Sequence, residues 1–242
     1  MSFLATRRVE PEIMDDPDLS PAEHAAALQG LARVHRLTGT VGRLLQPIER
    51  LARRLEVRQL TVMDVGCGDG LMLRNLARRA ARQGLVLRLI GCDFSSRALE
   101  LCEQQAAAEN LAIELRQVDI TTAPLPDTAD VIINSLFLHH FSEPQVIAIL
   151  QQFSGHAREL VMIEDLLRTR LGYSLCWLGV HLLTRSRVVH IDGLLSVRAA
   201  FSMPEIKLLL TQAGMSGADI YKHWPERFMV QWSPTAGALD VP

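Results

Sequence analysis

Residues 62–70 read VMDVGCGDG, an apolar run that ends in three glycines at alternate positions, Gly66, Gly68 and Gly70. The apolar run is typical of a buried strand, and residues 71–84 (LMLRNLARRAARQG) have the spacing of a helix. Glycine at such a turn permits a positive φ and lets the backbone approach a ligand closely. The helix N-terminus adds N–H donors and the positive end of the helix dipole. The stretch therefore predicts a ligand-binding loop between a strand and a helix.

The residues around the loop narrow the class of ligand. A P-loop needs Gly-Lys-Ser/Thr after its glycines, but Leu71 and Met72 stand there. A dinucleotide-binding turn has the spacing GxGxxG, whose third glycine would fall at the position of Leu71. Asp64 precedes the loop and Asp69 lies within it, and these carboxylates would repel a pyrophosphate but attract an amino group and a sulfonium. The alternative for the glycines is a plain tight turn that binds no ligand. For the function of the protein, a nicotinamide-dependent oxidoreductase is a further possibility, which the glycine spacing opposes.

The chain alternates strand-like and helical segments from residue 60 to residue 165. The expected strands are short and apolar nearly throughout: 61–66, 85–93, 113–119, 129–135 and 159–165. Such alternation is typical of stacked βαβ units with a parallel sheet that helices cover on both faces. Capping boxes predict helix starts at Ser142 and Ser202, and two further strand-like segments, 218–224 and 227–232, complete the domain.

The segments outside this alternation are expected to attach to one main domain. A helix is predicted from Ser20 to about Leu37 and another from about Val41 to Leu55. The apolar side chains of the insertion 166–200 predict a hydrophobic lid over the acceptor; the alternatives are packing on the domain or dimer formation. The expected division is 1–59 for an irregular arm and cover helices, 60–165 for the α/β core, 166–200 for the lid insertion, 201–232 for the last helix and strand pair, and 233–242 for the tail.

Composition excludes several classes of protein. The 242 residues are 48% hydrophobic and 21% charged with a net charge of −2, so a globular core is expected and a nucleic-acid partner is not. The four cysteines form no CxxC pair, which favours buried reduced thiols. The N-terminus has no apolar run of signal-peptide length. The longest uncharged apolar stretch, 171–183, is shorter than the roughly 20 residues of a spanning helix. We expect a cytoplasmic monomer or homodimer without stable membrane insertion.

The stretch VMDVGCGDG resembles motif I of the class I S-adenosylmethionine (SAM)-dependent methyltransferases, and further motifs follow in the family's order up to residue 165. Asp93, followed by Phe94, ends the second strand, where the family places an acid on the ribose hydroxyls. Asp119 and Ile120 come at the end of the third strand. There the family has an Asp that hydrogen-bonds to the adenine amine and an apolar neighbour that packs on the adenine ring. Residues 134–140 (NSLFLHH) resemble the segment that passes beneath the methionine part of the cofactor and reaches toward the acceptor.

The resemblance implies a Rossmann-like, doubly wound α/β fold with a seven-stranded, mainly parallel sheet, N-terminal helices and a helical lid insertion. It implies SAM as the cofactor, with these candidate contacts: Asp64, Gly66, Cys67, Gly68, Gly70, Asp93, Phe94, Asp119, Ile120, Asn134 and Leu136. Cys67 is expected to be a small filler without chemistry. Asp93 has an alternative role as a helix N-cap, and Asp119 has one as the cap of a turn.

Candidate residues for the acceptor lie on loops at the carboxyl ends of the strands, where ligands of open α/β sheets bind. Histidine is the usual base near neutral pH, and the candidates are His139, His140, His181 and His190. His190 is favoured, because Asp192 would orient its ring and Arg198 would pair with an acidic or phenolate acceptor. The alternatives are a structural Asp192–Arg198 ion pair and, for His139 and His140, one ring that caps the loop and one that faces solvent.

The remaining signals concern the acceptor itself. Glu164 and Asp165 end the fifth strand, where they contact the acceptor or serve as caps. We expect no metal, because the histidine pair 139–140 is the only ligand cluster in the sequence and adjacent residues seldom bind one ion. Residues 14–24 and 190–201 also resemble bacterial small-molecule methyltransferases of polyketide or quinone pathways. The prediction is methyl transfer from SAM to oxygen, or activated carbon, of a hydrophobic or aromatic small molecule; the alternative is a non-catalytic SAM-binding protein.

Overall fold

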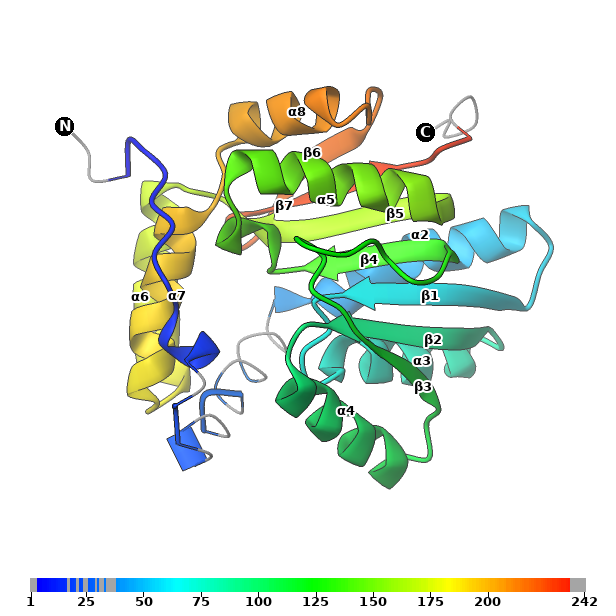
Figure 1. Cartoon of the computed structure of the whole chain (residues 1–242), viewed down its shortest axis with the longest axis horizontal. Helices are drawn as coiled ribbons and strands as arrows, with labels where there is room; N and C mark the ends of the chain where they lie inside the picture. Colours follow the sequence, from blue (N-terminus) through cyan, green and yellow to red (C-terminus); the bar gives the residue numbers. More distant parts are fainter. Residues whose placement is uncertain are drawn as a thin grey trace.

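The computed structural model describes residues 4–16, 18–20, 22–23, 26–28, 30, 33 and 38–235. At its centre lies a seven-stranded sheet with the order β3-β2-β1-β4-β5-β7-β6 (Figure 1). The strands are β1 (Gln59–Val65), β2 (Val86–Asp93), β3 (Ile113–Gln117), β4 (Ala129–Ser135), β5 (Ala157–Leu166), β6 (Asp219–His223) and β7 (Arg227–Trp232). β1 to β5 pair in parallel, and β7 runs antiparallel to both β5 and β6. The predicted doubly wound, mainly parallel sheet of seven strands is confirmed.

Helices cover both faces of this sheet (Figure 1). α2 (Thr40–Arg54), α3 (Leu71–Arg82) and α4 (Ser96–Ala108) pack on one face, and α5 (Glu143–His156) and α8 (Met203–Gln212) pack on the other. Side chains alternate along β1, so Val62 joins the core under α2 and Met63 joins the core under α5. Both residues are fully buried, which explains why the strands are apolar at successive positions.

Capping boxes begin α5 and α8 where the sequence predicts them. In α8 the Ser202 side chain accepts from the backbone N–H of Glu205, and the Glu205 carboxylate accepts from the Ser202 N–H at 2.7 Å. Glu205 also forms an ion pair with Arg168, whose Nη2 lies 2.6 Å from Oε1. Arg168 is buried just after β5, so this pair fastens the start of α8 to the end of that strand.

We expect Glu205→Gln to lower stability in a pH-dependent way. Burial opposes ionisation of Glu205, but the Arg168 guanidinium and the Ser202 N–H outweigh burial and lower the pKa to about 2. The carboxylate therefore stabilises the fold above its ordinary pKa of about 4.3, and this contribution is lost as the pH falls from about 5 toward 2. Urea unfolding should show a wild-type advantage at about pH 7 that shrinks below about pH 5. A constant advantage would contradict the pairing, and Glu103→Gln, at an exposed position of α4, is the control.

The carboxyl ends of the parallel strands meet the insertion and the N-terminal arm, on the left of Figure 1. The insertion is helical, as expected, with α6 (Arg170–Leu183) and α7 (Arg187–Ala199). The arm, residues 4–16 with the 3-10 helix η1 (Ile13–Asp15), lies along α7, where Asp192 accepts the N–H groups of Ile13 and Met14 at 2.9 Å each. The helix predicted from residue 20 to 37 falls mostly outside the described residues, as does the tail beyond residue 235.

The apolar side chains of α6 differ from the lining expected of a lid. Leu171, Trp177 and Leu182 are 52%, 51% and 73% exposed, whereas Val180 is buried among residues of α7 and the N-terminal segment. These three side chains are therefore at least half exposed, and the action of the hairpin as a lid stays a prediction. Within the described part of the chain, no helix has the length and apolar character needed to cross a bilayer.

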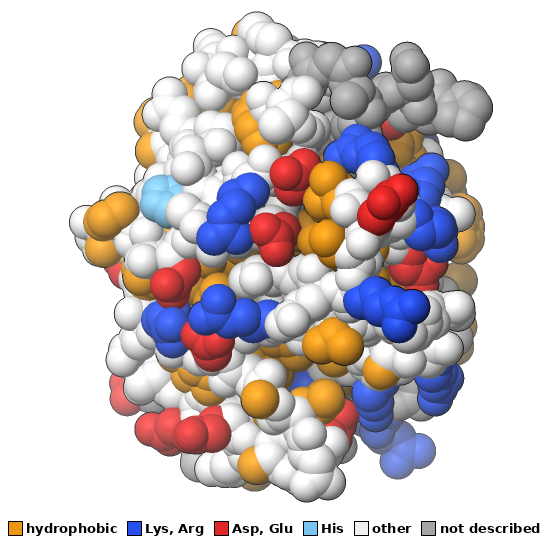
Figure 2. All heavy atoms as spheres, turned by 90° about the vertical axis from the view of Figure 1, so that its right-hand side faces the viewer, with side chains coloured by type: hydrophobic (Ala, Val, Ile, Leu, Met, Phe, Trp, Pro, Cys, Tyr) orange, Lys and Arg blue, Asp and Glu red, His pale blue; other side chains and the backbone are white. Residues whose placement is uncertain are grey.

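The edge at which the parallel strands begin carries charges of both signs (Figure 2). Arg158, near the start of β5, pairs with Asp130 at 2.9 Å, and Arg54 lies 3.8 Å from Glu159. Basic and acidic side chains alternate over this face, so it does not form the uniformly basic surface that nucleic-acid binding requires.

Candidate functional site

The glycine loop connects β1 to α3 at the carboxyl edge of the sheet. Gly66, Gly68 and Gly70 have φ angles of 76°, 53° and 71°, in the left-handed region that glycine adopts without strain. The N–H groups of Gly66 and Cys67 both donate to the Cys92 carbonyl, at 2.8 and 3.0 Å, and so fasten the loop to the end of β2. The predicted turn of positive φ between a strand and a helix is confirmed.

Two of these glycines are required by packing, and the third leaves an open space. A Cβ at Gly66 would collide with the ring of Phe137, and a Cβ at Gly70 would collide with the thiol of Cys102 in α4. At Gly68 no atom of the described residues lies within 4 Å of the place a Cβ would take. The backbone at Gly68 is therefore open to a ligand, while Gly66 lets the segment after β4 lie directly on the loop.

Gly70→Ala should lower stability more than Gly84→Ala. Both glycines have left-handed φ angles, of 71° and 73°, but only Gly70 faces a close neighbour. The left-handed conformation costs alanine about 1–2 kcal/mol at either position, and the clash with Cys102 adds about 1–3 kcal/mol at Gly70 alone. Chemical denaturation of the two variants measures the difference. Equal losses of stability would contradict the close packing of the loop against α4.

Asp93, the last residue of β2, holds the loop from the other side. Its Oδ2 accepts from the Gly68 N–H at 2.8 Å, and its Oδ1 accepts from the Ser95 N–H at 3.0 Å. The N-cap of α4 is Ser95, whose side chain accepts from the N–H of Ala98, so the alternative of Asp93 as the helix cap is wrong. Phe94 is 58% exposed and offers an apolar surface beside this carboxylate.

Two carboxyl groups make the surroundings of the loop favourable for a cation. Burial raises the pKa of Asp64 well above its ordinary value, and the charge of nearby Asp93 raises it further. Burial also raises the pKa of Asp93, against the opposing effect of hydrogen bonds from backbone N–H groups. A positively charged ligand would favour both ionised forms, whereas a pyrophosphate would oppose them. The electrostatics therefore favour a sulfonium compound over a dinucleotide.

The end of β4 places polar atoms next to the loop. Asn134 is fully buried, and its amide donates to the Val65 carbonyl at 2.6 Å. Its Oδ1 and the Oγ of Ser135 have no hydrogen-bond partner among the described residues. Leu136 has a left-handed φ of 54° and donates its N–H to the Glu164 carbonyl at 2.9 Å. Buried polar atoms cost free energy unless they are hydrogen-bonded, so those of Asn134 and Ser135 fit a polar ligand such as the methionine part of SAM.

Asp119 and Ile120, predicted at the adenine, make structural contacts. Asp119 is exposed, and its Oδ1 accepts from the N–H and the hydroxyl of Thr121 at 2.9 and 2.6 Å, so it caps a turn, the alternative role. Ile120 is 5% exposed and packs in the core under α5, which leaves almost no surface for a ring. The prediction for Ile120 is therefore corrected to a core residue. Cys67 is buried too, and hydrogen bonding with the Cys102 thiol together with burial raises the pKa of its own thiol.

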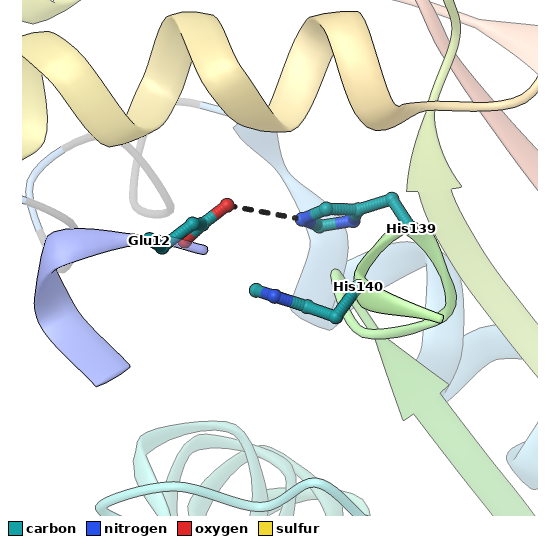
Figure 3. Close-up of side chains that lie close together, drawn as sticks. All are labelled: Glu12, His139 and His140. Atoms are coloured by element: carbon teal, nitrogen blue, oxygen red, sulfur yellow. Dashed lines mark ion pairs between the residues drawn. The ribbon is translucent and has the colours of Figure 1, made fainter. Parts of the chain in front are cut away.

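His139 lies at the centre of a charged cluster at the same edge, in the 3-10 helix η2 (Leu138–His140) that follows β4. Its Nδ1 hydrogen-bonds to Asp165 Oδ1 at 2.7 Å, and its backbone N–H donates to Asp165 Oδ2 at 3.2 Å. Its Nε2 points toward Glu12, whose Oε1 lies 3.7 Å away, and its ring stacks on His140 with centroids 4.3 Å apart (Figure 3). His139 and Asp165 are buried, so the carboxylate fixes the orientation and the tautomer of the ring.

Burial and two carboxylates determine the charges in this cluster. Burial opposes the charged form of His139, but Asp165 and Glu12 outweigh burial and raise its pKa to about 9. Burial and the neighbouring His139 lower the pKa of His140 to about 4. Positive charge is therefore favoured at the His139 ring, between the carboxylates, while His140 is neutral at physiological pH.

The N-terminal arm brings Glu12 to this cluster. Arg7 donates to the His139 carbonyl at 2.8 Å, and the Ser196 hydroxyl of α7 donates to Glu12 Oε1 at 2.5 Å. No local pattern in the sequence joins Arg7 or Glu12 to the segment after β4, and none pairs His139 with Asp165. The sequence analysis therefore included His139 and Asp165 among the candidates but missed Arg7, Glu12 and the pairing of His139 with Asp165.

The predicted cluster of His190, Asp192 and Arg198 does not form. All three lie on α7, where positions i and i+2 face different sides of the helix. His190 Nε2 hydrogen-bonds to the Thr184 carbonyl at 3.0 Å, and Arg198 pairs with Glu10 at 3.0 Å. Asp192 binds the backbone of the arm, so the alternative of an Asp192–Arg198 ion pair is wrong as well.

The two acids that end β5 have different partners. Glu164 Oε1 accepts from the Thr40 hydroxyl at 3.0 Å and lies 3.2 Å from His223 Nε2. Glu164 therefore joins α2 to β6 inside the fold, whereas Asp165 orients His139. Both carboxyl groups are fully buried, and direct contact of either one with an acceptor stays a prediction.

The prediction of no metal rested on the adjacent pair His139 and His140 alone. The structure places Glu12 beside both rings, so that one ligand atom from each of the three residues lies within 4.8 Å of the others. His140 is half-buried in this cluster, where its ring stacks on that of His139.

A family model described as a methyltransferase domain matches residues 62–159, from β1 into β5. The match includes the glycine loop, Asp93 and His139. Over these residues the chain is similar to the class I SAM-dependent methyltransferases. The chain is 28% identical over 159 residues to the ubiquinone biosynthesis O-methyltransferase of Brucella melitensis biotype 2. The aligned region covers 62% of this chain and 61% of the relative. The chain thus spans about three fifths of the length of the curated relatives it matches first.

Solved methyltransferase structures share the fold. The plantazolicin methyltransferase BpumL, in complex with a monoazolic desmethylPZN analog and SAH, superposes with a TM-score of 0.60 at 16% identity, over 84% of this chain and 88% of that chain. An O-methyltransferase family 2 protein from Planctomyces limnophilus, in complex with apigenin, superposes with a TM-score of 0.53 at 18% identity, over 72% of this chain and 50% of that chain. At these identities the likeness concerns the fold.

Proposed function

We propose that this methyltransferase transfers the methyl group of SAM to an oxygen atom of a hydrophobic, aromatic small molecule. One observation carries the proposal: the glycine loop held by Asp93 and the His139–Asp165 pair lie at the same edge of the sheet. Phe137 links the two, because its ring lies on Gly66 and η2 begins at the next residue. The cofactor loop and an oriented imidazole are thus brought side by side.

At the cofactor end, SAM supplies an electrophilic methyl group on a sulfonium, and the chain binds and orients it. The Asp93 carboxylate, which holds Gly68, would also accept hydrogen bonds from the ribose hydroxyls. Asn134 Oδ1 and Ser135 Oγ would take polar groups of the methionine part. Asp64 lies buried beside the loop, where its ionised form would offset the positive charge of the ligand.

At the acceptor end, methyl transfer to a phenol is an in-line displacement. The acceptor oxygen forms a bond to the methyl carbon, the carbon–sulfur bond breaks, and the phenolic proton leaves. A phenol of pKa ~10 needs a neighbouring base or positive charge to react at neutral pH. Asp165 holds Nδ1 of His139, so Nε2, on the side of Glu12, is the ring atom left to act on the acceptor. We place His139 there as a positive charge beside the acceptor oxygen, at the position for which the sequence favoured His190.

Two kinds of observation support an aromatic acceptor. The curated relative is named for O-methylation in ubiquinone biosynthesis, and one structural neighbour is in complex with apigenin. The exposed ring of Phe94 and the Phe137–Phe141 pair, with centroids 4.7 Å apart, add aromatic surface near the loop and η2. Transfer to an activated carbon is the alternative acceptor chemistry.

Incubation of the enzyme with radiolabelled SAM and a panel of phenols, aromatic carboxylic acids and quinone precursors tests the proposal. We expect label in one class of product, a mass gain of one CH2 and a methoxy signal by NMR. A C-methyl signal would overturn transfer to oxygen. Intact SAM binding without labelled product from any acceptor would favour a non-catalytic SAM-binding protein.

A further inference from the structure

We propose that Glu12, His139 and His140 bind a divalent transition-metal ion of the Zn2+ class, and that Asp165 positions His139 for this role. One ligand atom from each of the three residues lies within 4.8 Å of the other two. Figure 3 shows the carboxylate and both rings turned toward a common space between the arm and η2. The fold, and not the sequence order, brings the three ligands together.

The spacing suits an ion after small side-chain adjustments. Zn2+ binds histidine nitrogen at about 2.0–2.1 Å and carboxylate oxygen at about 2.0–2.2 Å, so two tetrahedral ligands of one ion lie about 3.4 Å apart. Nε2 of His139 lies 3.7 Å from Glu12 Oε1. This separation is too long for a strong hydrogen bond, but it is close to the separation of two ligands of one ion.

The ligands are held in place by contacts of their own. A metal-binding imidazole usually donates its other N–H to a carboxylate, which fixes the tautomer and raises the basicity of the ligand nitrogen. Asp165 makes this contact with Nδ1 of His139 at 2.7 Å. Ser196 donates a hydrogen bond to Glu12 Oε1, and Asp192 holds the N–H groups of the next two residues of the arm. The site is therefore organised by the protein around the space for the ion.

The donor set selects the class of cation. Two imidazoles and one carboxylate suit Zn2+, Fe2+ or Ni2+, whereas Mg2+ and Ca2+ prefer oxygen ligands alone. Glu12 and Asp165 bring two negative charges to His139, and Arg7, which donates to the His139 carbonyl, brings one positive charge. The ion would take the place of a proton on His139 Nε2, on the side of Glu12.

Three protein ligands leave a fourth position open, as in catalytic zinc sites. If the proposed function holds, a phenol bound at that position ionises more readily, its oxygen attacks the methyl group, and its proton passes to solvent. Binding of the ion does not depend on that function, so the two proposals are tested separately.

Calorimetric titration of ZnCl2 into the full chain after dialysis against EDTA tests the site, with MgCl2 as the comparison. We expect one equivalent of Zn2+ to bind and Mg2+ not to bind. Glu12→Gln and His140→Ala should each weaken Zn2+ binding about tenfold or more, and Asp165→Asn should weaken it about 10–100-fold. Glu10→Gln, at a salt-bridged position of the same arm, and His156→Ala, at the end of α5, should leave Zn2+ binding unchanged.

Two outcomes would overturn the site: no stoichiometric Zn2+ binding by the wild type, or Zn2+ binding with wild-type affinity in both Glu12→Gln and His140→Ala. Thermal unfolding gives a second readout, since Zn2+ should raise the Tm of the wild type and of Glu10→Gln but not that of Glu12→Gln. Titration of S-adenosylhomocysteine (SAH) into the same samples separates the proposals, because SAH binding without Zn2+ binding overturns the metal site alone.

Discussion

Asp93→Ala is expected to weaken SAH binding about 100-fold or more, because a hydrogen bond from a ribose hydroxyl to the carboxylate contributes about 1.5–3 kcal/mol and the ribose has two such hydroxyls. The same substitution removes the acceptor of the Gly68 N–H, which Asp93 holds at 2.8 Å. The ligand thus loses direct contacts and the loop loses part of its support. Isothermal titration calorimetry with SAH measures the change in Kd.

Asp127→Ala is the matched control for this variant. Asp127 forms a part-exposed ion pair with Arg116 at 2.8 Å, and such pairs contribute about 0–1 kcal/mol to stability. The Asp127→Ala variant should bind SAH with the affinity of the wild type. Wild-type affinity in a folded Asp93→Ala, checked by circular dichroism, would remove Asp93 from the cofactor site.

His139→Asn is expected to lower kcat about 100–10,000-fold, the range in which a positioned acid or base contributes, with little change in SAH affinity. Asparagine keeps a polar side chain that can reach Asp165, so the buried carboxylate is not left without a partner. The acceptor oxygen loses the imidazole that Asp165 orients. Steady-state kinetics with a phenolic acceptor, together with SAH calorimetry, separates an effect on turnover from an effect on cofactor binding.

His190→Asn and His156→Asn are the controls for this assignment. His190 hydrogen-bonds to the Thr184 carbonyl on the insertion, and His156 to the Gln152 carbonyl in α5. Both variants should turn over at the wild-type rate. Loss of turnover in His190→Asn, with activity retained in His139→Asn, would show that His190 on α7, and not His139, acts on the acceptor.

The parts of the fold that could be predicted are those with local signals. The strands were readable because a sheet covered on both faces needs apolar side chains at successive positions, as Val62 and Met63 illustrate. The glycine loop was readable because its backbone needs positive φ at fixed spacing. The capping boxes at Ser142 and Ser202 were also readable, because their hydrogen bonds join residues only three positions apart in the sequence.

The acceptor side could not be predicted in the same way, because its contacts join distant segments. Glu12 and Asp165 meet at His139 only once the arm has folded along α7. The cluster proposed around His190 failed for a local reason: residues 187–199 form a helix, and the polar side chains that lie close in sequence face different ways. Proximity in sequence was taken for proximity in space.

The ligand of the glycine loop tests the account most directly. Calorimetric titration of the wild-type chain with SAH, NAD+ and NADP+ compares a sulfur nucleoside with two pyrophosphate-bridged ligands. Asp64 and Asp93 favour the nucleoside, because their buried carboxyl groups oppose a pyrophosphate. The expected result is one equivalent of SAH bound and no heat of binding from either dinucleotide. Stoichiometric binding of NAD+ or NADP+, with none of SAH, would contradict the account.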